Sequence, residues 1–209
     1  RAVVLRQLRL QVHASELWSV SRAALNARAP VLALLHAPTG CLVDLAVNNC
    51  AAVLQSQRMR DLTDDRSRRL TRLVKLWARH RGVYGKAEGR LGGFGFAQLA
   101  LFFSQVGPRP PGDLSQQLRG FFRFYADDFD WARECVSVAT GRRVLQASRR
   151  AGGEPHLCIE DCFDRGSDAC VPALLAAESG RLREELARAA RLLERPGADL
   201  HEVFGAPPS

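Results

Sequence analysis

The sequence predicts an α+β protein in which a strand-bearing front end precedes a mostly helical body. Three observations support this prediction. Short apolar stretches separated by turn residues occupy the first 50 residues. From Ala51 onward the apolar spacing changes to the period of a helix. With 209 residues and 46% hydrophobic content, the chain can also bury a sizeable core.

The front end is expected to contain one helix and three strands. Residues 3–14 place apolar side chains on one side, which predicts an amphipathic helix. The apolar stretches at 29–35 and 41–47 are joined by "HAPTG", a Pro-Thr-Gly turn, and together they predict a hairpin. A weaker extended stretch at 17–21 is the candidate third strand.

Helices dominate the rest of the chain. Helical periodicity is found at 51–62, 65–81, 94–106, 114–127 and 171–194. "GGFG" interrupts the chain before the third of these helices, and "VGPRPPG" after it predicts a surface loop. Short extended segments are expected at 136–146 and 157–164. The longest apolar run, "FGFAQLALFF", is too short for a membrane span and predicts a core helix.

Charge favours a polyanionic partner such as RNA. The net charge is +8, and Lys75 and Lys86 are the only lysines among 30 basic residues. Guanidinium groups match phosphate with two parallel hydrogen bonds, so an arginine-rich surface suits nucleic acid. An arginine-rich genome or a basic compartment would give the same composition. The bias is compatible with the mitochondrial matrix as well as with the cytoplasm or nucleus.

The cysteines predict a reduced, intracellular setting. Six of them lie scattered in apolar contexts, at positions 41, 50, 135, 158, 162 and 170. A secreted disulfide framework would show a denser pattern. His156 and the last three cysteines are an alternative zinc cluster, but the paired spacing of such sites is absent. No signal peptide is recognised, and a chain that starts at Arg1 is expected to continue upstream.

Five segments, taken in order, resemble one known family. The segments are "ARAPVLALLHAPTGCLVDLAVNN", "DDRSRRLTRLVKLWARHRGV", "GRLGGFGFAQLALFFSQ", "LRGFFRFYADDFDW" and "LCIEDCFD". They are similar to the non-canonical poly(A) polymerases and terminal uridylyltransferases of the DNA polymerase β-like nucleotidyltransferase superfamily. The resemblance implies a partial nucleotidyltransferase palm domain with a short mixed sheet at 1–50. It implies a helical central and poly(A)-polymerase-associated domain at 51–209.

The resemblance implies addition of UMP or AMP to an RNA 3′ end, with UTP or ATP as substrate. Two Mg²⁺ (or Mn²⁺) ions would be held by three carboxylates. Asp44 matches the third carboxylate, and so becomes the candidate catalytic residue and metal ligand. A strand carboxylate that faces solvent is the alternative. Asn49 matches the position that contacts the ribose, and the Ser56 hydroxyl is a candidate contact to sugar or phosphate.

Other nucleotide-binding candidates follow from the same resemblance. Lys75 and Arg79 lie four residues apart on one helix face, which in the family points at the β- and γ-phosphates. A solvated basic face is the alternative. Phe94 matches an aromatic residue that stacks on the base. A core position at a helix start is the alternative. Gly93 replaces a serine that often donates to phosphate.

The base-binding edge is expected after residue 159. Glu160, Asp161 and Asp164 match acidic residues that shape this edge in the family. Ser167 stands where some uridine-selective members have a histidine, so the choice of base stays open.

Two of the family's three carboxylates have no counterpart in the sequence. No aspartate precedes Asp44, and Glu16 is the only acidic residue before it. One carboxylate cannot hold two Mg²⁺ ions against their hydration. The missing Asp-x-Asp pair is therefore expected upstream of Arg1. The alternative is a catalytically inactive scaffold that binds RNA or other proteins in a ribonucleoprotein particle. A nucleotide-binding regulatory subunit is a third possibility.

Overall fold

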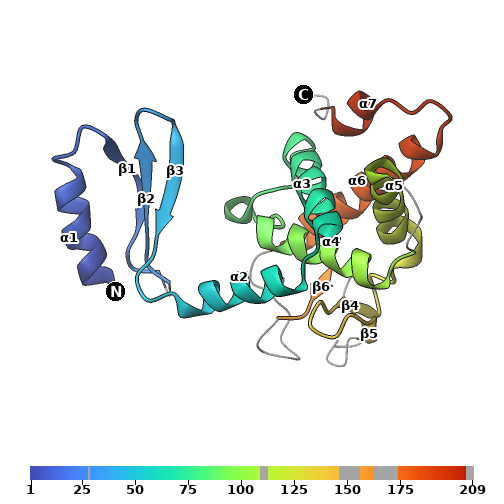
Figure 1. Cartoon of the computed structure of the whole chain (residues 1–209), viewed down its shortest axis with the longest axis horizontal. Coiled ribbons are helices and arrows are strands. Elements are labelled where there is room, and N and C mark those ends of the chain that lie inside the picture. Colours follow the sequence, from blue (N-terminus) through green and yellow to red (C-terminus); the bar gives the residue numbers. More distant parts are fainter. Residues whose placement is uncertain (28, 109–112, 146–155, 162–173, 206–209) are drawn as a thin grey trace. The chain divides into compact units, whose positions relative to one another are not determined.

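The computed structural model describes residues 1–27, 29–108, 113–145, 156–161 and 174–205. It divides into two compact units, Arg1–Met59 and Arg60–Ser209. Figure 1 shows the order of the elements along the chain. None of the helices in these ranges is both long and apolar enough to cross a membrane.

The first unit is a helix and a three-stranded sheet. Its elements are α1 (Ala2–Val12), β1 (Trp18–Ala24), β2 (Val31–His36) and β3 (Cys41–Leu45), followed by α2 (Cys50–Leu62), which continues into the second unit. The strands pair in the order β1-β2-β3, and both pairings are antiparallel. The predicted helix and hairpin are therefore confirmed, and the third strand is longer than expected. The described strands here form an antiparallel sheet, not the mixed one that was expected.

Helix α1 packs against one face of this sheet. The buried cluster consists of Leu5 and Val12 from α1 and Leu32 and Leu34 from β2. Because side chains alternate across a strand, the odd-numbered residues of β2, such as Ala33, lie on the sheet face that α1 does not cover. Asp44 is paired with Ala33 and therefore belongs to that other face.

The second unit is mainly helical. Its helices are α3 (Asp65–His80), the 3₁₀ turn η1 (Lys86–Glu88), α4 (Gly93–Val106), α5 (Leu114–Arg123), the π-helical turn η2 (Phe124–Asp128), α6 (Ala176–Glu194) and α7 (Leu200–Phe204). A small sheet of order β5-β4-β6 joins β4 (Glu134–Val136), β5 (Val144–Leu145) and β6 (Cys158–Ile159). Strand β4 pairs antiparallel with β5 and parallel with β6.

Aromatic side chains fill the core of the second unit. The largest fully buried ones are Trp77, Phe96, Phe102, Phe121, Phe122, Phe124 and Tyr125. The Tyr125 hydroxyl donates to the carbonyl of Leu99 at 2.9 Å, and Trp131 Nε1 donates to the carbonyl of Tyr125 at 2.8 Å. These bonds satisfy polar atoms that burial would otherwise leave without partners. Buried aromatic side chains of α4 and α5 contribute to this core, and both helices contact α3.

The predicted helices of the body are confirmed, except that the last one begins at Ala176 instead of residue 171. There are two other differences. The segment predicted at 114–127 as one helix ends as α5 at Arg123 and continues as a π-helical turn. The short helix α7 was not predicted. Residues 171–173 of the last predicted helix lie outside the described residues.

Candidate functional site

Helix α3 carries the two predicted triphosphate-binding cations. The Asp64 carboxylate accepts a hydrogen bond from the backbone N–H of Ser67 at 2.7 Å, and the backbone N–H of Asp64 donates to the Ser67 hydroxyl at 3.1 Å. This capping box satisfies orphan donors at the helix start, and the hydrogen bonds from Ser67 lower the pKa of Asp64. The buried face of α3 includes Leu70, Val74 and Trp77, each with no exposed surface. The helix predicted at 65–81 is thus confirmed, and part of its apolar side is buried.

Lys75 and Arg79 share a face of α3, as their spacing predicts. Lys75 is half-buried and Arg79 is exposed. Burial lowers the pKa of Lys75, and the positive charge of Arg79 lowers it further. Neither side chain has an ion-pair partner within the described part of the chain. A bound anion would relieve both effects, so this face is suited to anion binding.

Tyr84 holds the Arg79 guanidinium. The Arg79 Cζ atom lies 4.7 Å from the centroid of the Tyr84 ring, and Arg79 Nη2 lies 3.5 Å from the Tyr84 hydroxyl oxygen. The Tyr84 ring also stacks on buried Phe96, with 6.0 Å between centroids and 9° between planes. The Arg79 guanidinium therefore packs on the Tyr84 ring, and that ring is in turn supported by Phe96 of α4.

The "GGFG" segment begins α4 at a crowded point. A Cβ atom on Gly93 would lie 2.5 Å from the Tyr84 hydroxyl oxygen, and one on Gly95 would collide with the Leu91 side chain. Gly92, the N-cap residue, makes no side-chain cap, so the first turn of α4 presents its N–H groups and the positive end of the helix dipole. The turn thus lies next to the Arg79 and Tyr84 side chains.

Phe94 is the second residue of α4 and is partly exposed. Its side chain is 38% exposed, whereas Phe96, two residues later, is fully buried. Phe94 is therefore not a buried core residue, which was the alternative from the sequence. It is accessible to a stacking partner. Lys75, Arg79 and Phe94 all belong to the second unit, where α3 packs on α4.

Asp44 lies in β3 of the first unit, on the sheet face that α1 does not cover. It is exposed, and it faces Ala33 across the β2–β3 pairing. The described residues provide no hydrogen bond or ion pair to its carboxylate. Its oxygens are therefore available, which both the metal-ligand hypothesis and the solvent-facing alternative require.

The turn between β3 and α2 is formed by the two asparagines. Asn48 has a positive φ of 52°, a left-handed conformation that asparagine tolerates better than most residues. The Asn49 carbonyl accepts from the N–H of Val53 at 3.4 Å, in the first turn of α2. In the next turn the Ser56 hydroxyl donates to the Ala52 carbonyl at 2.9 Å. Its lone pairs remain available, but its proton is used within the helix.

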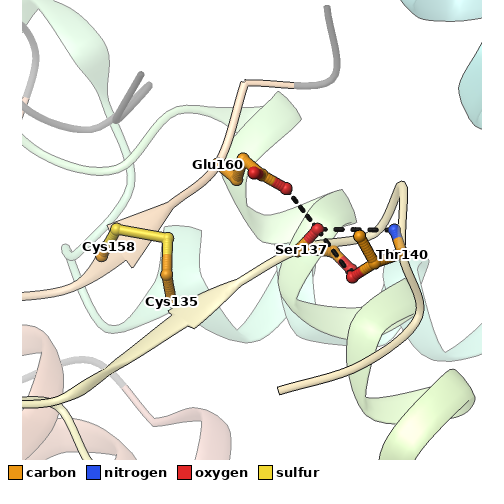
Figure 2. Close-up of a disulfide and its surroundings, with 5 residues drawn as sticks. All are labelled: Cys135, Ser137, Thr140, Cys158 and Glu160. Atoms are coloured by element: carbon orange, nitrogen blue, oxygen red, sulfur yellow. Dashed lines mark hydrogen bonds between the residues drawn. A yellow bond between two sulfur atoms is a disulfide. The ribbon is translucent and has the colours of Figure 1, made fainter. Parts of the chain in front are cut away.

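The third predicted region follows β6. Asp161 is half-buried directly after this strand, and Asp164 lies outside the described residues, as does Ser167. The Glu160 carboxylate accepts a hydrogen bond from the Ser137 hydroxyl (Figure 2). The backbone N–H of Glu160 donates to the Val136 carbonyl at 2.9 Å. Glu160 is thus engaged in holding β6 to the segment after β4.

One pair of cysteines contradicts the expectation of free thiols. Cys135 on β4 and Cys158 on β6 lie opposite each other and form a disulfide (Figure 2). The expectation failed because the scattered spacing gives no sign of which strands pair. Cys41 and Cys50 are free and exposed, and positions 162 and 170 lie outside the described residues. Since Cys158 is bonded, the alternative zinc cluster loses one ligand, and the described residues contain no other group of three ligands.

Sequence reasoning missed Tyr84 and the left-handed conformation of Asn48. An asparagine between a strand and a helix is a recognisable signal for a left-handed turn. Tyr84 gave no such signal, because its importance depends on the return of the chain from η1 to α4.

Comparisons with known proteins agree with the resemblance. The sequence profile described as "Cid1 family poly A polymerase" matches residues 113–166. The poly(A) RNA polymerase GLD2-A of Xenopus laevis is 24% identical over 178 aligned residues, which cover 67% of this chain and 35% of that protein. The human poly(A) RNA polymerase GLD2 is 20% identical over the same length, with 67% and 37% covered. The chain thus spans about a third of the length of these curated relatives.

Solved structures show the same fold. The crystal structure of mtPAP in complex with UTP matches with a TM-score of 0.78 and 18% identity, covering 99% of this chain and 52% of that one. The crystal structure of the Cid1 poly(U) polymerase matches with a TM-score of 0.77 and 18% identity, covering 98% and 78%. The fold is therefore the α+β nucleotidyltransferase fold. The chain is therefore similar in sequence to poly(A) RNA polymerases, carries a match to the Cid1 family poly A polymerase model at residues 113–166, and shares its fold with mtPAP and the Cid1 poly(U) polymerase.

Proposed function

We propose that this chain is part of an RNA 3′-terminal nucleotidyltransferase that adds UMP or AMP from UTP or ATP. One observation carries the proposal. Lys75 and Arg79, which have no ion-pair partner among the described residues, share a face of α3, and Tyr84 links Arg79 to the uncapped start of α4, in a chain similar to poly(A) RNA polymerases. Cations and helix N-termini are the groups that bind phosphates in proteins. An accessible aromatic ring at the same helix start, Phe94, suits a nucleobase.

Each predicted residue has a proposed role. Lys75 and Arg79 would bind the β- and γ-phosphates, and Phe94 would stack on the base. Asn49 and Ser56 would contact the sugar. The remaining base contacts are assigned to the acidic residues Asp161 and Asp164.

Asp44 would supply one metal ligand. An exposed carboxylate without a described partner is a suitable oxygen donor for Mg²⁺ or Mn²⁺. A single carboxylate cannot balance two divalent ions, so the proposal includes two further carboxylates upstream of Arg1. When bound, the metal ions would neutralise charge on the attacking and leaving oxygens of the transfer.

Two observations favour an alternative, an inactive scaffold that binds RNA or proteins in a ribonucleoprotein particle. Asp44 is the only one of the three carboxylates in this sequence, and Gly93 lacks the serine hydroxyl of the family. A nucleotide-binding regulatory subunit would need the Lys75–Arg79 face but not Asp44.

The test is a tailing assay of the full-length polypeptide on RNA with a free 3′ hydroxyl, with UTP or ATP and Mg²⁺. Asp44→Ala is expected to abolish tailing. Because Asp44 is exposed, the variant should keep its free energy of unfolding within about 0.5 kcal/mol. Glu16→Gln, which changes another exposed acidic residue of the first unit, is the matched control and should keep full activity.

The other outcomes separate the alternatives. Tailing that survives in Asp44→Ala would show that Asp44 is not the metal ligand. A wild-type protein that does not tail RNA, but whose melting temperature rises with UTP or ATP, would be a regulatory subunit. Absence of both tailing and stabilisation would leave the scaffold.

A further inference from the structure

The space beside Gly93 is filled by the hydroxyl of another residue. A Cβ atom built on Gly93 would lie 2.5 Å from Tyr84 Oη and 3.3 Å from Tyr84 Cζ. A serine at position 93 would project its side chain into the volume that this phenol group occupies. The family resemblance implies a serine at position 93, and in this chain the Tyr84 hydroxyl lies close to where that side chain would begin.

The Tyr84 hydroxyl still has its proton to donate. Its oxygen lies 3.5 Å from Arg79 Nη2, and in that contact the guanidinium is the donor and the phenol the acceptor. No acceptor for the O–H group is found within the described part of the chain. Tyr84 as a whole is only half-buried.

Three kinds of donor converge at this point. They are the Tyr84 hydroxyl, the Arg79 guanidinium and the N–H groups in the first turn of α4, which no side chain caps. The helix has 14 residues, so its dipole adds a positive potential at the same place. Stacking on Phe96 keeps the phenol from rotating away. The arrangement is prepared for an anion with several acceptor oxygens.

We infer that Tyr84 is a phosphate-binding residue, whose hydroxyl donates to the triphosphate of the nucleotide in place of the serine that Gly93 replaces. The inference rests on the proposed function and adds a residue to its site. It also accounts for the glycine, since a side chain at position 93 and the Tyr84 hydroxyl cannot occupy the same space. Lys75, one helical turn before Arg79 on α3, adds a second cation, whose pKa is lowered by burial and by Arg79.

Reciprocal substitutions test the inference through binding of UTP and ATP, measured by calorimetry on the full chain. Tyr84→Phe keeps the ring on Phe96 and under Arg79 and removes the hydroxyl. We expect it to weaken triphosphate binding roughly tenfold, as for loss of a weak hydrogen bond to a charged group. Gly93→Ser alone should also weaken binding, because its side chain collides with the Tyr84 hydroxyl.

The double variant decides between a binding role and a packing role. In Tyr84→Phe/Gly93→Ser a hydroxyl returns to the site and the closest clash is removed, so affinity should recover to within about threefold of wild type, well inside the energy of one hydrogen bond. A merely structural role would give additive losses. A structural role would also lower the affinity for uridine and adenosine. If Tyr84 binds phosphate, these nucleosides, which lack phosphates, should bind all variants equally.

Three outcomes would overturn the inference. They are unchanged triphosphate affinity in Tyr84→Phe, additive loss in the double variant, and equal loss for nucleosides and triphosphates. Melting temperatures without ligand establish that each variant is folded. Failure of the wild-type chain to bind either triphosphate would instead refute the proposed nucleotide-binding function itself.

Discussion

Lys75 is placed where its charge is costly to the free protein. It is half-buried on α3, one helical turn from another cation, and both circumstances lower its pKa. A lysine whose pKa is lowered by folding destabilises the folded state at every pH where it is protonated in both states. Such a charge is retained when it serves a ligand, because a bound triphosphate turns the unfavourable environment into a favourable one.

Lys75→Met should therefore raise stability and lower binding. At pH 7 the melting temperature of the ligand-free variant should exceed that of the wild type. The difference should shrink as the pH approaches 10.5, the ordinary value for lysine, because the wild-type side chain then loses its proton and the penalty. Binding of UTP or ATP should weaken by roughly tenfold or more, the loss expected for a hydrogen bond to a charged group. Thermal melts across pH and calorimetry measure the two effects.

Arg69→Met is the matched control for Lys75. Arg69 is an exposed cation on the same helix without a described partner, and its position places it away from the Lys75–Arg79 face. Its substitution should change neither the melting temperature nor nucleotide affinity. Equal effects of the two substitutions would mean that general charge, not the position of Lys75, is responsible.

At the level of elements, Arg81 connects three helices of the second unit. It follows α3 directly, and its guanidinium binds the Glu185 carboxylate of α6 with two hydrogen bonds of 2.7 and 2.8 Å. It also donates to the carbonyl of Gly205, the residue that ends α7. The Arg81 side chain is 4% exposed, so the pair is a buried one.

Removal of one partner from this pair should be strongly destabilising. Arg81→Met leaves Glu185 without its partner in a mostly buried position, which typically costs about 3–5 kcal/mol. Arg81→Met/Glu185→Met should recover most of this loss, since no charge is then left unpaired. Urea unfolding of the full chain measures the three free energies. Arg195→Met, which breaks the exposed pair with Glu202, is the control and should cost at most about 1 kcal/mol.

The disulfide between β4 and β6 makes a second prediction about elements. It closes a loop between residues 23 apart, and the chain-entropy model gives about 3 kcal/mol for such a loop. Dithiothreitol should therefore lower the melting temperature of the wild type and leave Cys135→Ser/Cys158→Ser unchanged. Alkylation of the native protein should label the exposed Cys41 and Cys50 and spare this pair. Labelling of Cys135 and Cys158 without reductant would show that the bond is absent in solution.

Elements with a periodic pattern could be predicted from the sequence, whereas those set by tertiary contacts could not. Helix α3 follows from its capping residues and its apolar face, and the β2–β3 hairpin from its Pro-Thr-Gly turn. The π-helical turn at Phe124–Asp128 is closed by a hydrogen bond from the N–H of Phe129 to the Phe124 carbonyl, and no periodicity predicts it. Lys75 and Arg79 could be predicted because their spacing is local. Tyr84 could not, because its partner Gly93 lies beyond η1.

At the scale of the whole molecule, the proposed site residues divide between the two compact units. Lys75, Arg79, Tyr84 and Phe94 belong to Arg60–Ser209, whereas Asp44 belongs to Arg1–Met59. The larger unit also contains nearly all of the buried aromatic residues. The smaller unit has a buried cluster of four residues, which is a small core for an independently stable domain. Phosphate binding and metal binding are therefore proposed for separate parts of the chain.

A fragment of residues 60–209 should fold alone and bind tripolyphosphate without tailing RNA. It keeps the Asp64 cap of α3 and the aromatic core, so cooperative thermal unfolding is expected. A ligand that binds the folded state at 100 times its Kd contributes about 2.7 kcal/mol of stability, so tripolyphosphate should raise the melting temperature by several degrees. The same fragment with Lys75→Met should lose most of this rise, and residues 1–59 alone should show no cooperative transition. A fragment that folds but is not stabilised, when the full chain is, would show that phosphate binding also needs the first unit.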